Sequence, residues 1–87
     1  MTAVSEAETL KDLIHSIAVE LVDRPDEVEV AEIPDDNNTS SLIELRVAKE
    51  DIGKVIGKEG RTAQSMRTIL TAVSQKLGRR AHLDIVD

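Results

Sequence analysis

Two glycines separated by two polar residues form the most chemically informative segment of the sequence, VIGKEGRT over residues 55–62. Gly57 can adopt the left-handed conformation that ends one helix, and Gly60 lets the backbone turn sharply into the next. The N–H groups at the start of this second helix have no partner within it, and the helix dipole there favours an anion. The segment therefore predicts a site where a phosphate group lies against the backbone.

Basic side chains surround the same turn, namely Lys54, Lys58 and Arg61. They would steer a phosphate toward the backbone, although Glu59 beside them lowers the affinity for an anion. Two other interpretations stay open at this point. The glycines could serve only as a turn between two helices, and the basic residues could form a solvated face, as most charge clusters do.

The sequence contains none of the residue patterns that an enzyme or a metal site needs. It has no Cys, and His15 and His82 lie far apart without a spaced second ligand, so we expect no metal and no cofactor. Residues 35–38 lack the EF-hand spacing and its terminal Glu, and residues 57–62 lack the ending of a Walker sequence. Ser40 and Ser41 have no plausible histidine partner. We therefore predict a protein that is not an enzyme.

The elements that position the glycine turn follow from the spacing of apolar residues. Helical spacing predicts a helix from about residue 10 to 22 with Thr9 as its N-cap, a short helix over 49–56, and a long one over 61–77 that Gly78 ends. The apolar stripe of the long helix comprises Ala63, Met66, Ile69, Leu70, Val73 and Leu77. Alternating residues predict strands over 28–33, 42–47 and 81–86, with a polar turn over 34–41 between the first two. We predict an α+β fold of order α-β-β-α-α-β, with the helices on one face of a three-stranded sheet.

In this order of elements, the glycine turn resembles the GXXG loop of KH domains, with the apolar pair Val55 and Ile56 before it. The arrangement of elements around the loop resembles the type II, bacterial KH topology. In its length, in this arrangement of elements and in the segment IGKEGRT, the chain is similar to the KhpA family of small single-domain bacterial proteins. The resemblance covers about residues 10–86. One departure is Ala63, where the KH pattern often has a larger aliphatic residue.

The resemblance implies a protein that binds single-stranded RNA, with its backbone on the loop and its bases in an adjoining apolar groove. The RNA-binding residues that we expect are Lys54, Ile56, Gly57, Lys58, Glu59, Gly60, Arg61 and Thr62. The resemblance also implies pairing, either as a homodimer or with a larger KH-containing partner of the KhpB (Jag) type. It further implies an RNA chaperone or post-transcriptional regulator in cell elongation and wall homeostasis.

Length and composition limit the other possibilities. The chain has 87 residues, so we expect a frayed N-terminus over 1–8 and a single domain over 9–87. No apolar run approaches the roughly 20 residues that span a bilayer, and the first nine residues do not resemble a signal peptide, so we expect a cytoplasmic protein. Phe, Tyr and Trp are absent, which removes base stacking worth about 1–3 kcal/mol per base and predicts weak binding by one copy.

The formal net charge of −6 by itself argues against a nucleic-acid partner. Its distribution changes this inference. Residues 1–45 hold two basic and 12 acidic residues, whereas residues 46–87 hold nine basic and five acidic residues. We therefore expect an RNA-facing side and an opposite side that repels RNA. The rival hypothesis is a protein-interaction module that uses the acidic first helix, with Asp12, Glu20 and Asp23 exposed; a sensor of nucleotides or other small anions ranks last.

Overall fold

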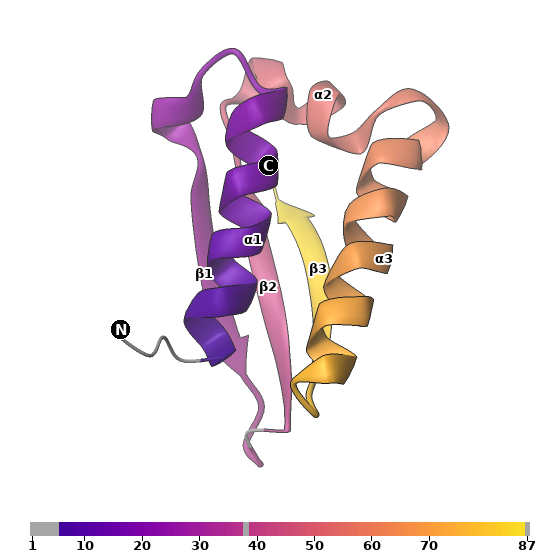
Figure 1. The fold of residues 1–87 in the computed structure, drawn as a ribbon. Helices are drawn as coiled ribbons and strands as arrows, with labels where there is room; N and C mark the ends of the chain where they lie inside the picture. The colour runs from indigo at the N-terminus through magenta and orange to yellow at the C-terminus, as the bar shows by residue number, and fades with distance from the viewer. Residues whose placement is uncertain (1–5, 38, 87) are drawn as a thin grey trace, which may run out of the picture.

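The helices and strands of the computed structural model confirm the predicted order α-β-β-α-α-β (Figure 1). The structure describes residues 6–37 and 39–86. Its helices are α1 (Glu6–Leu21), α2 (Ile52–Ile56) and α3 (Arg61–Lys76), and its strands are β1 (Glu29–Pro34), β2 (Ser40–Arg46) and β3 (Arg80–Val86). Three short 3-10 turns connect them, η1 (Pro25–Glu27), η2 (Lys49–Asp51) and η3 (Lys58–Gly60). Among the described residues, no helix combines the length and apolar character needed to cross a membrane.

The three strands form one mixed sheet with β2 in the centre. β1 and β2 are antiparallel, with Glu29 opposite Arg46, as expected for a hairpin. β2 and β3 are parallel, with Ser40 beside Arg80, and such a pair needs a crossover connection, which α2 and α3 supply. α1 and α3 lie on the same face of the sheet (Figure 1). The prediction of helices on one face of a three-stranded sheet is therefore confirmed.

The core lies between this helical layer and the sheet. Apolar residues at every third or fourth position of α1 and α3 face inward, and β2 and β3 contribute every second residue. The buried residues include Leu10, Ile14 and Ala18 of α1, Ile43 and Leu45 of β2, Met66 and Leu70 of α3, and Ala81 and Leu83 of β3. Because all of these side chains are aliphatic or thioether groups, the core is built without aromatic rings, as the composition requires.

Two positions predicted on the helices are wrong. Thr9 lies inside α1, which begins at Glu6, so it does not cap the helix. Ile69 belongs to the predicted apolar stripe of α3, but it is 43% exposed and does not pack in the core with the other members. It lies about 100° of helix rotation from Leu70, beyond the sector that faces the sheet. The predicted frayed start and the boundary at residue 9 stay predictions, because residues 1–5 lie outside the described part of the chain.

Candidate nucleic-acid interface

The GXXG segment forms a tight turn between α2 and α3, at the opposite end of the molecule from the β1–β2 turn (Figure 1). Gly57 has φ +79° and ψ 173°, and its N–H closes the end of α2 by donating to the Gly53 carbonyl at 2.9 Å. Gly60 has φ +74°, and its N–H donates to the Gly57 carbonyl at 3.1 Å. Both residues lie at positive φ, but only Gly60, with ψ 12°, is in the left-handed helical region; Gly57 ends α2 in an extended conformation of positive φ instead of the predicted left-handed one.

Glu59 between them also has a positive φ of 57°, which is uncommon for a residue with a side chain. The backbone of the loop therefore bends through left-handed conformations from Glu59 to Gly60. Strained backbone of this kind is frequently found at functional sites, where the surrounding structure holds it in place. No side chain caps α3 at its N-cap residue Gly60, so this helix end is open to a ligand from outside.

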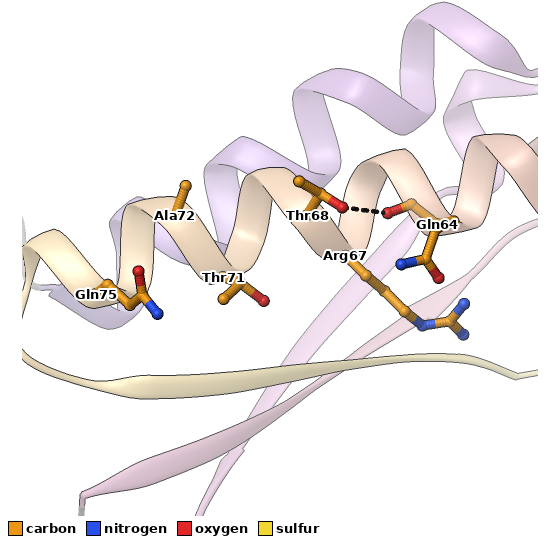
Figure 2. A pocket seen from close by; sticks show the side chains of 6 residues that line it. All are labelled: Gln64, Arg67, Thr68, Thr71, Ala72 and Gln75. Atoms are coloured by element: carbon orange, nitrogen blue, oxygen red, sulfur yellow. Dashed lines mark hydrogen bonds between the residues drawn. The ribbon is translucent and has the colours of Figure 1, made fainter.

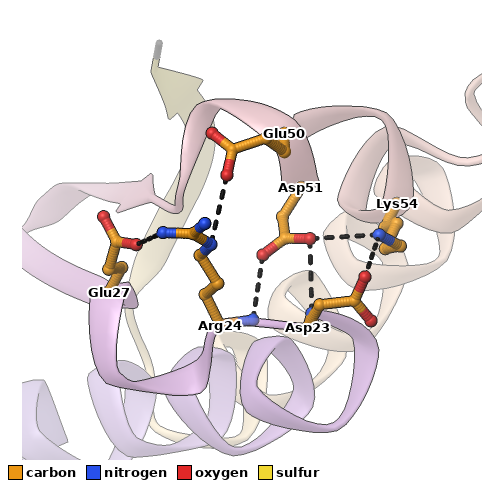
Figure 3. Close-up of polar contacts among 6 residues, drawn as sticks. All are labelled: Asp23, Arg24, Glu27, Glu50, Asp51 and Lys54. Carbon is orange, nitrogen blue, oxygen red and sulfur yellow. Dashed lines mark hydrogen bonds and ion pairs between the residues drawn. The ribbon is translucent and has the colours of Figure 1, made fainter.

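The predicted basic residues differ in what they contact. Lys58 is exposed on the loop. The side chain of Arg61 is 80% exposed and pairs with Glu59 at 3.3 Å. An exposed pair of this kind is worth little, so a phosphate can take the place of the carboxylate. Lys54, in contrast, has its ammonium 2.7 Å from Asp23 and 3.1 Å from the buried Asp51 (Figure 3).

The apolar pair before the loop divides between core and surface. Val55 is fully buried, whereas Ile56, the last residue of α2, is 40% exposed. Thr62 lies on the other side of the loop and packs against Gly57, whose missing side chain leaves room for it. The predicted site residues therefore gather around one turn, with Ile56 as its exposed apolar member.

A hollow lies between the middle of α3 and the first part of β3. It has a volume of about 150 Å³ and is lined by Arg67, Leu70, Thr71, Ala81, His82 and Leu83. Figure 2 shows the adjoining surface of α3, where Arg67 extends toward β3. β3 pairs only with β2 in the described sheet, so it is an edge strand with backbone groups facing away from β2. The sequence predicts a groove formed by both loop-flanking helices and a neighbouring strand, whereas this hollow is lined by α3 and β3 alone.

None of the six residues that line the hollow is among the RNA-binding residues that the sequence predicts. His82 was read as an ordinary surface residue, and it does lie exposed on β3. The sequence feature that could have indicated this surface is the row of polar residues on one side of α3, namely Gln64, Arg67, Thr71 and Gln75. Nothing in that row indicates which strand lies beside it, because the parallel pairing of β3 with β2 is a long-range contact.

Comparisons with known proteins show which family the chain is similar to. The family model described as the KH domain of KhpA/KhpB matches residues 11–85. An RNA-binding protein KhpA from Aquifex aeolicus is 49% identical over 78 residues, covering 90% of this chain and 96% of that protein. A protein of the same name from Halalkalibacterium halodurans is also 49% identical over 78 residues, covering 90% of this chain and 100% of that protein.

Solved structures share the fold at low sequence identity. A crystal structure of Aquifex aeolicus Era bound to GDP and aluminium fluoride superposes with a TM-score of 0.60 at 20% identity, over 97% of this chain and 31% of that one. Era in complex with a magnesium-bound GTP analogue and a segment of 16S ribosomal RNA superposes with a TM-score of 0.58 at 19% identity, over 94% and 30%. This chain thus spans about a third of the length of each Era chain.

Proposed function

The chain belongs to the KhpA/KhpB KH-domain family, and we propose that it binds single-stranded RNA with the GXXG loop on the phosphates and the bases in the α3–β3 hollow. The observation that carries the proposal is the exposed loop at the uncapped start of α3, where Lys58 and Arg61 face solvent, with the hollow further along the same helix. Curated relatives bear the name RNA-binding protein KhpA, which supports the same conclusion. The protein would act by binding rather than by catalysis, in the cytoplasm.

The loop would hold the RNA backbone by two means. The first-turn N–H groups of α3 and the helix dipole favour an anion at Gly60. The exposed cations of Lys58 and Arg61 would contact the phosphates, with Arg61 exchanging its exposed partner Glu59 for a phosphate. Of the three predicted cations, Lys54 is the one whose ammonium already has two carboxylate partners. Gly57 and Thr62 would keep the loop in shape.

The hollow would take up the bases through apolar and polar contacts. Leu70, Ala81 and Leu83 supply an aliphatic surface, and Arg67 supplies a cation that stacks on base planes. Backbone groups at the edge of β3 can form hydrogen bonds with base edges. Because the chain has no aromatic residues, we expect weak binding with little sequence specificity.

Changing the loop charge tests this proposal. Replacing Lys58 and Glu59 together by Asp should lower RNA affinity about tenfold or more, since a charge-assisted hydrogen bond is worth about 1.5–3 kcal/mol. Binding of a labelled oligouridylate measures the affinity, and circular dichroism with urea unfolding checks the fold. Lys76→Asp changes the net charge by the same amount at the far end of α3 and should have a much smaller effect. Unchanged affinity in the loop variant would contradict the proposal.

A second part of the proposal concerns pairing. Weak RNA binding by one domain gains strength when two copies act together, through their effective concentration. The family resemblance suggests a homodimer or a heterodimer with a larger KhpB-type protein, acting as an RNA chaperone or post-transcriptional regulator in cell elongation and wall homeostasis. The exposed Ile69 supports a pairing surface on α3. It lies about 200° of helix rotation from Arg67 and Thr71, so pairing there would leave the hollow open.

Ile69→Lys should therefore weaken any self-association without weakening RNA binding by the single domain. Sedimentation equilibrium measures the association, and titration with a short RNA that spans one domain measures the intrinsic affinity. If the variant associates as the wild type does, Ile69 is not part of a pairing surface. If it associates less and the loop variant binds RNA normally, the alternative function as a protein-interaction module is favoured.

A further inference from the structure

The helix that leads into the GXXG loop cannot hold its own position. α2 has only five residues, far fewer than the roughly 12–15 that an isolated helix needs to be even marginally stable in water. Val55 anchors one side of it in the core. The orientation of α2, and with it the start of the loop, must depend on contacts from outside the helix.

Asp51 supplies such a contact. It occupies the N-cap position of α2, where an aspartate usually accepts a hydrogen bond from its own helix, but it makes no such cap. Its side chain is only 1% exposed and reaches across to the end of α1 (Figure 3). The N–H of Asp23 donates to its Oδ1 at 3.3 Å, and the N–H of Arg24 donates to its Oδ2 at 3.1 Å. One carboxylate thus joins α2 to a turn 27 and 28 residues away in the sequence.

Lys54 completes this junction one helical turn later. Its Nζ donates to Asp51 Oδ1 at 3.1 Å and to Asp23 Oδ2 at 2.7 Å, so it bridges the same two segments. Around this centre, Arg24 Nε lies 3.1 Å from Glu50 and its Nη1 lies 3.1 Å from Glu27 (Figure 3). Arg24 therefore connects η1 to η2 through two ion pairs whose side chains are exposed, unlike that of Asp51.

The charges of this junction depend on one another. Burial acts to raise the pKa of the Asp51 carboxyl, but the N–H of Asp23, the ammonium of Lys54 and the N–H of Arg24 together hold that pKa below its ordinary value. Hydrogen bonds to Asp23 and Asp51 raise the pKa of Lys54. If Lys54 swung out to a phosphate, Asp51 would keep a buried negative charge without its cation, which is strongly unfavourable.

From these contacts we propose that Asp51 and Lys54 are positioning residues, which lock α2 onto the end of α1 and so hold the GXXG loop ready for RNA without touching it. The inference rests on the proposed function for the ligand of the loop. On this proposal, Lys54, Lys58 and Arg61 have different roles although all three lie around the same turn. Lys58 and Arg61 face solvent and can meet phosphates, whereas Lys54 neutralises a buried carboxylate.

The salt dependence of RNA binding separates the two roles. Each cation that meets a single-strand phosphate contributes about 0.7 to the slope of log K against log salt. Lys58→Gln should therefore reduce the magnitude of the slope by about 0.7, whereas Lys54→Gln should leave the slope at the wild-type value. The probe is a labelled oligouridylate, and circular dichroism confirms that both variants are folded. A reduction of about 0.7 in Lys54→Gln as well would overturn the inference.

Hydrogen exchange tests the positioning role without any RNA. Asp51→Asn removes the charge but keeps an oxygen acceptor, so the variant is expected to fold. Exchange at the amides of Asp23, Arg24, Gly57 and Gly60 should accelerate about tenfold or more relative to the amides of β2, since a charged hydrogen-bond partner is lost. RNA affinity should fall about 5- to 30-fold, the cost of ordering one more loop residue on binding.

Asp35→Asn is the matched control. Asp35 also accepts N–H groups, from Thr39 at 2.9 Å and Ser40 at 3.3 Å, but it lies in the β1–β2 turn at the far end of the molecule. This variant should accelerate exchange at Thr39 and Ser40 and leave the loop unaffected. Equal acceleration of loop and β2 amides in Asp51→Asn, or none, would overturn the inference. Absence of RNA binding by the wild type would instead overturn the proposed function, and exchange would still decide the role of Asp51.

Discussion

Gly57 and Gly60 have the same residue type and similar φ angles, yet their surroundings differ. A Cβ atom at Gly57 would collide with Oγ1 of Thr62 and lie 2.6 Å from its Cβ and 2.9 Å from its backbone nitrogen. A Cβ atom at Gly60 would have no neighbour within 4 Å. The first glycine is therefore required by both backbone and packing, and the second by backbone alone.

Alanine at these two positions should separate the two requirements. Gly60→Ala should lower the free energy of unfolding by about 1–2 kcal/mol, the cost of a left-handed residue with a side chain. Gly57→Ala should cost about 1–3 kcal/mol for its backbone conformation, with the displacement of Thr62 added. Urea unfolding measures both values. Equal costs for the two variants would show that Thr62 moves aside freely.

At the scale of elements, α2 is the shortest of the three described helices, and its sequence does not favour a helix. It contains Gly53, which has an ordinary helical conformation and is exposed. Glycine inside a helix is less favourable than alanine because it loses more conformational freedom on folding. The helix thus relies for its position on Val55, on the partly buried Ile52 and on the contacts of Asp51 and Lys54, whereas α1 and α3 have whole apolar stripes in the core.

Gly53→Ala should therefore raise the stability of the domain by about 0.5–1 kcal/mol. A Cβ atom at this position has no neighbour within 4 Å, so no packing cost opposes the gain. The urea midpoint at an unchanged m-value measures it. A loss of stability would mean that the space beside Gly53 is occupied in solution, for example by a second copy of the chain.

At the scale of the whole molecule, the charge does not divide as the sequence suggests. The acidic half and the basic half were expected on opposite sides. In the structure they meet at the junction of α1 and α2, where Asp23 lies 2.7 Å from Lys54 and Glu50 lies 3.1 Å from Arg24. The predicted separation into an RNA-facing and an acidic side is wrong there, since the end of α1 packs beside the helix that leads into the loop.

Two carboxylates at opposite ends of the molecule make its stability depend on pH. The pKa of Asp51 is lowered as described above. Burial acts to raise the pKa of Asp35, but the N–H groups and hydroxyls of Ser40 and Thr39 outweigh it and lower that pKa. A carboxyl whose pKa is lower in the folded chain than in the unfolded chain stabilises the fold at pH values above its unfolded pKa of about 3.9. This stabilisation is lost as the pH falls through the pKa of the folded chain.

We therefore expect the free energy of unfolding to fall in acid, below about pH 4. The pKa of Lys54 is raised in the folded chain. Its contribution to the free energy of unfolding is therefore complete below the pKa of an unfolded lysine, about 10.4, and is lost only at higher pH. Urea unfolding across this range measures the profile. Asp51→Asn should make the acid decline shallower, whereas Asp84→Asn, on the exposed side of β3, should leave it in place. An identical decline in both variants would contradict the assignment to Asp51.

The sequence by itself determined the order of the elements, the buried faces of β2 and β3, and the turn at Gly57 and Gly60. These features depend on the spacing of residues within about one helical turn or one strand, which physical rules translate directly into local structure. Resemblance to a known family then added the expected ligand. The alternation of Ile43 and Leu45 in β2 and the left-handed Gly78 after α3 are examples that the structure confirms.

Only the tertiary structure decided which residues from distant segments act together. It brought Arg67 beside β3, left Ile69 exposed on the other side of α3, and joined Asp51 to the end of α1. The physical reason is that such contacts depend on how helices and strands pack, and packing is not encoded in any short window of sequence. For that reason Lys54, Lys58 and Arg61 look equivalent in the sequence, whereas in the folded chain one has a buried partner and the other two face solvent.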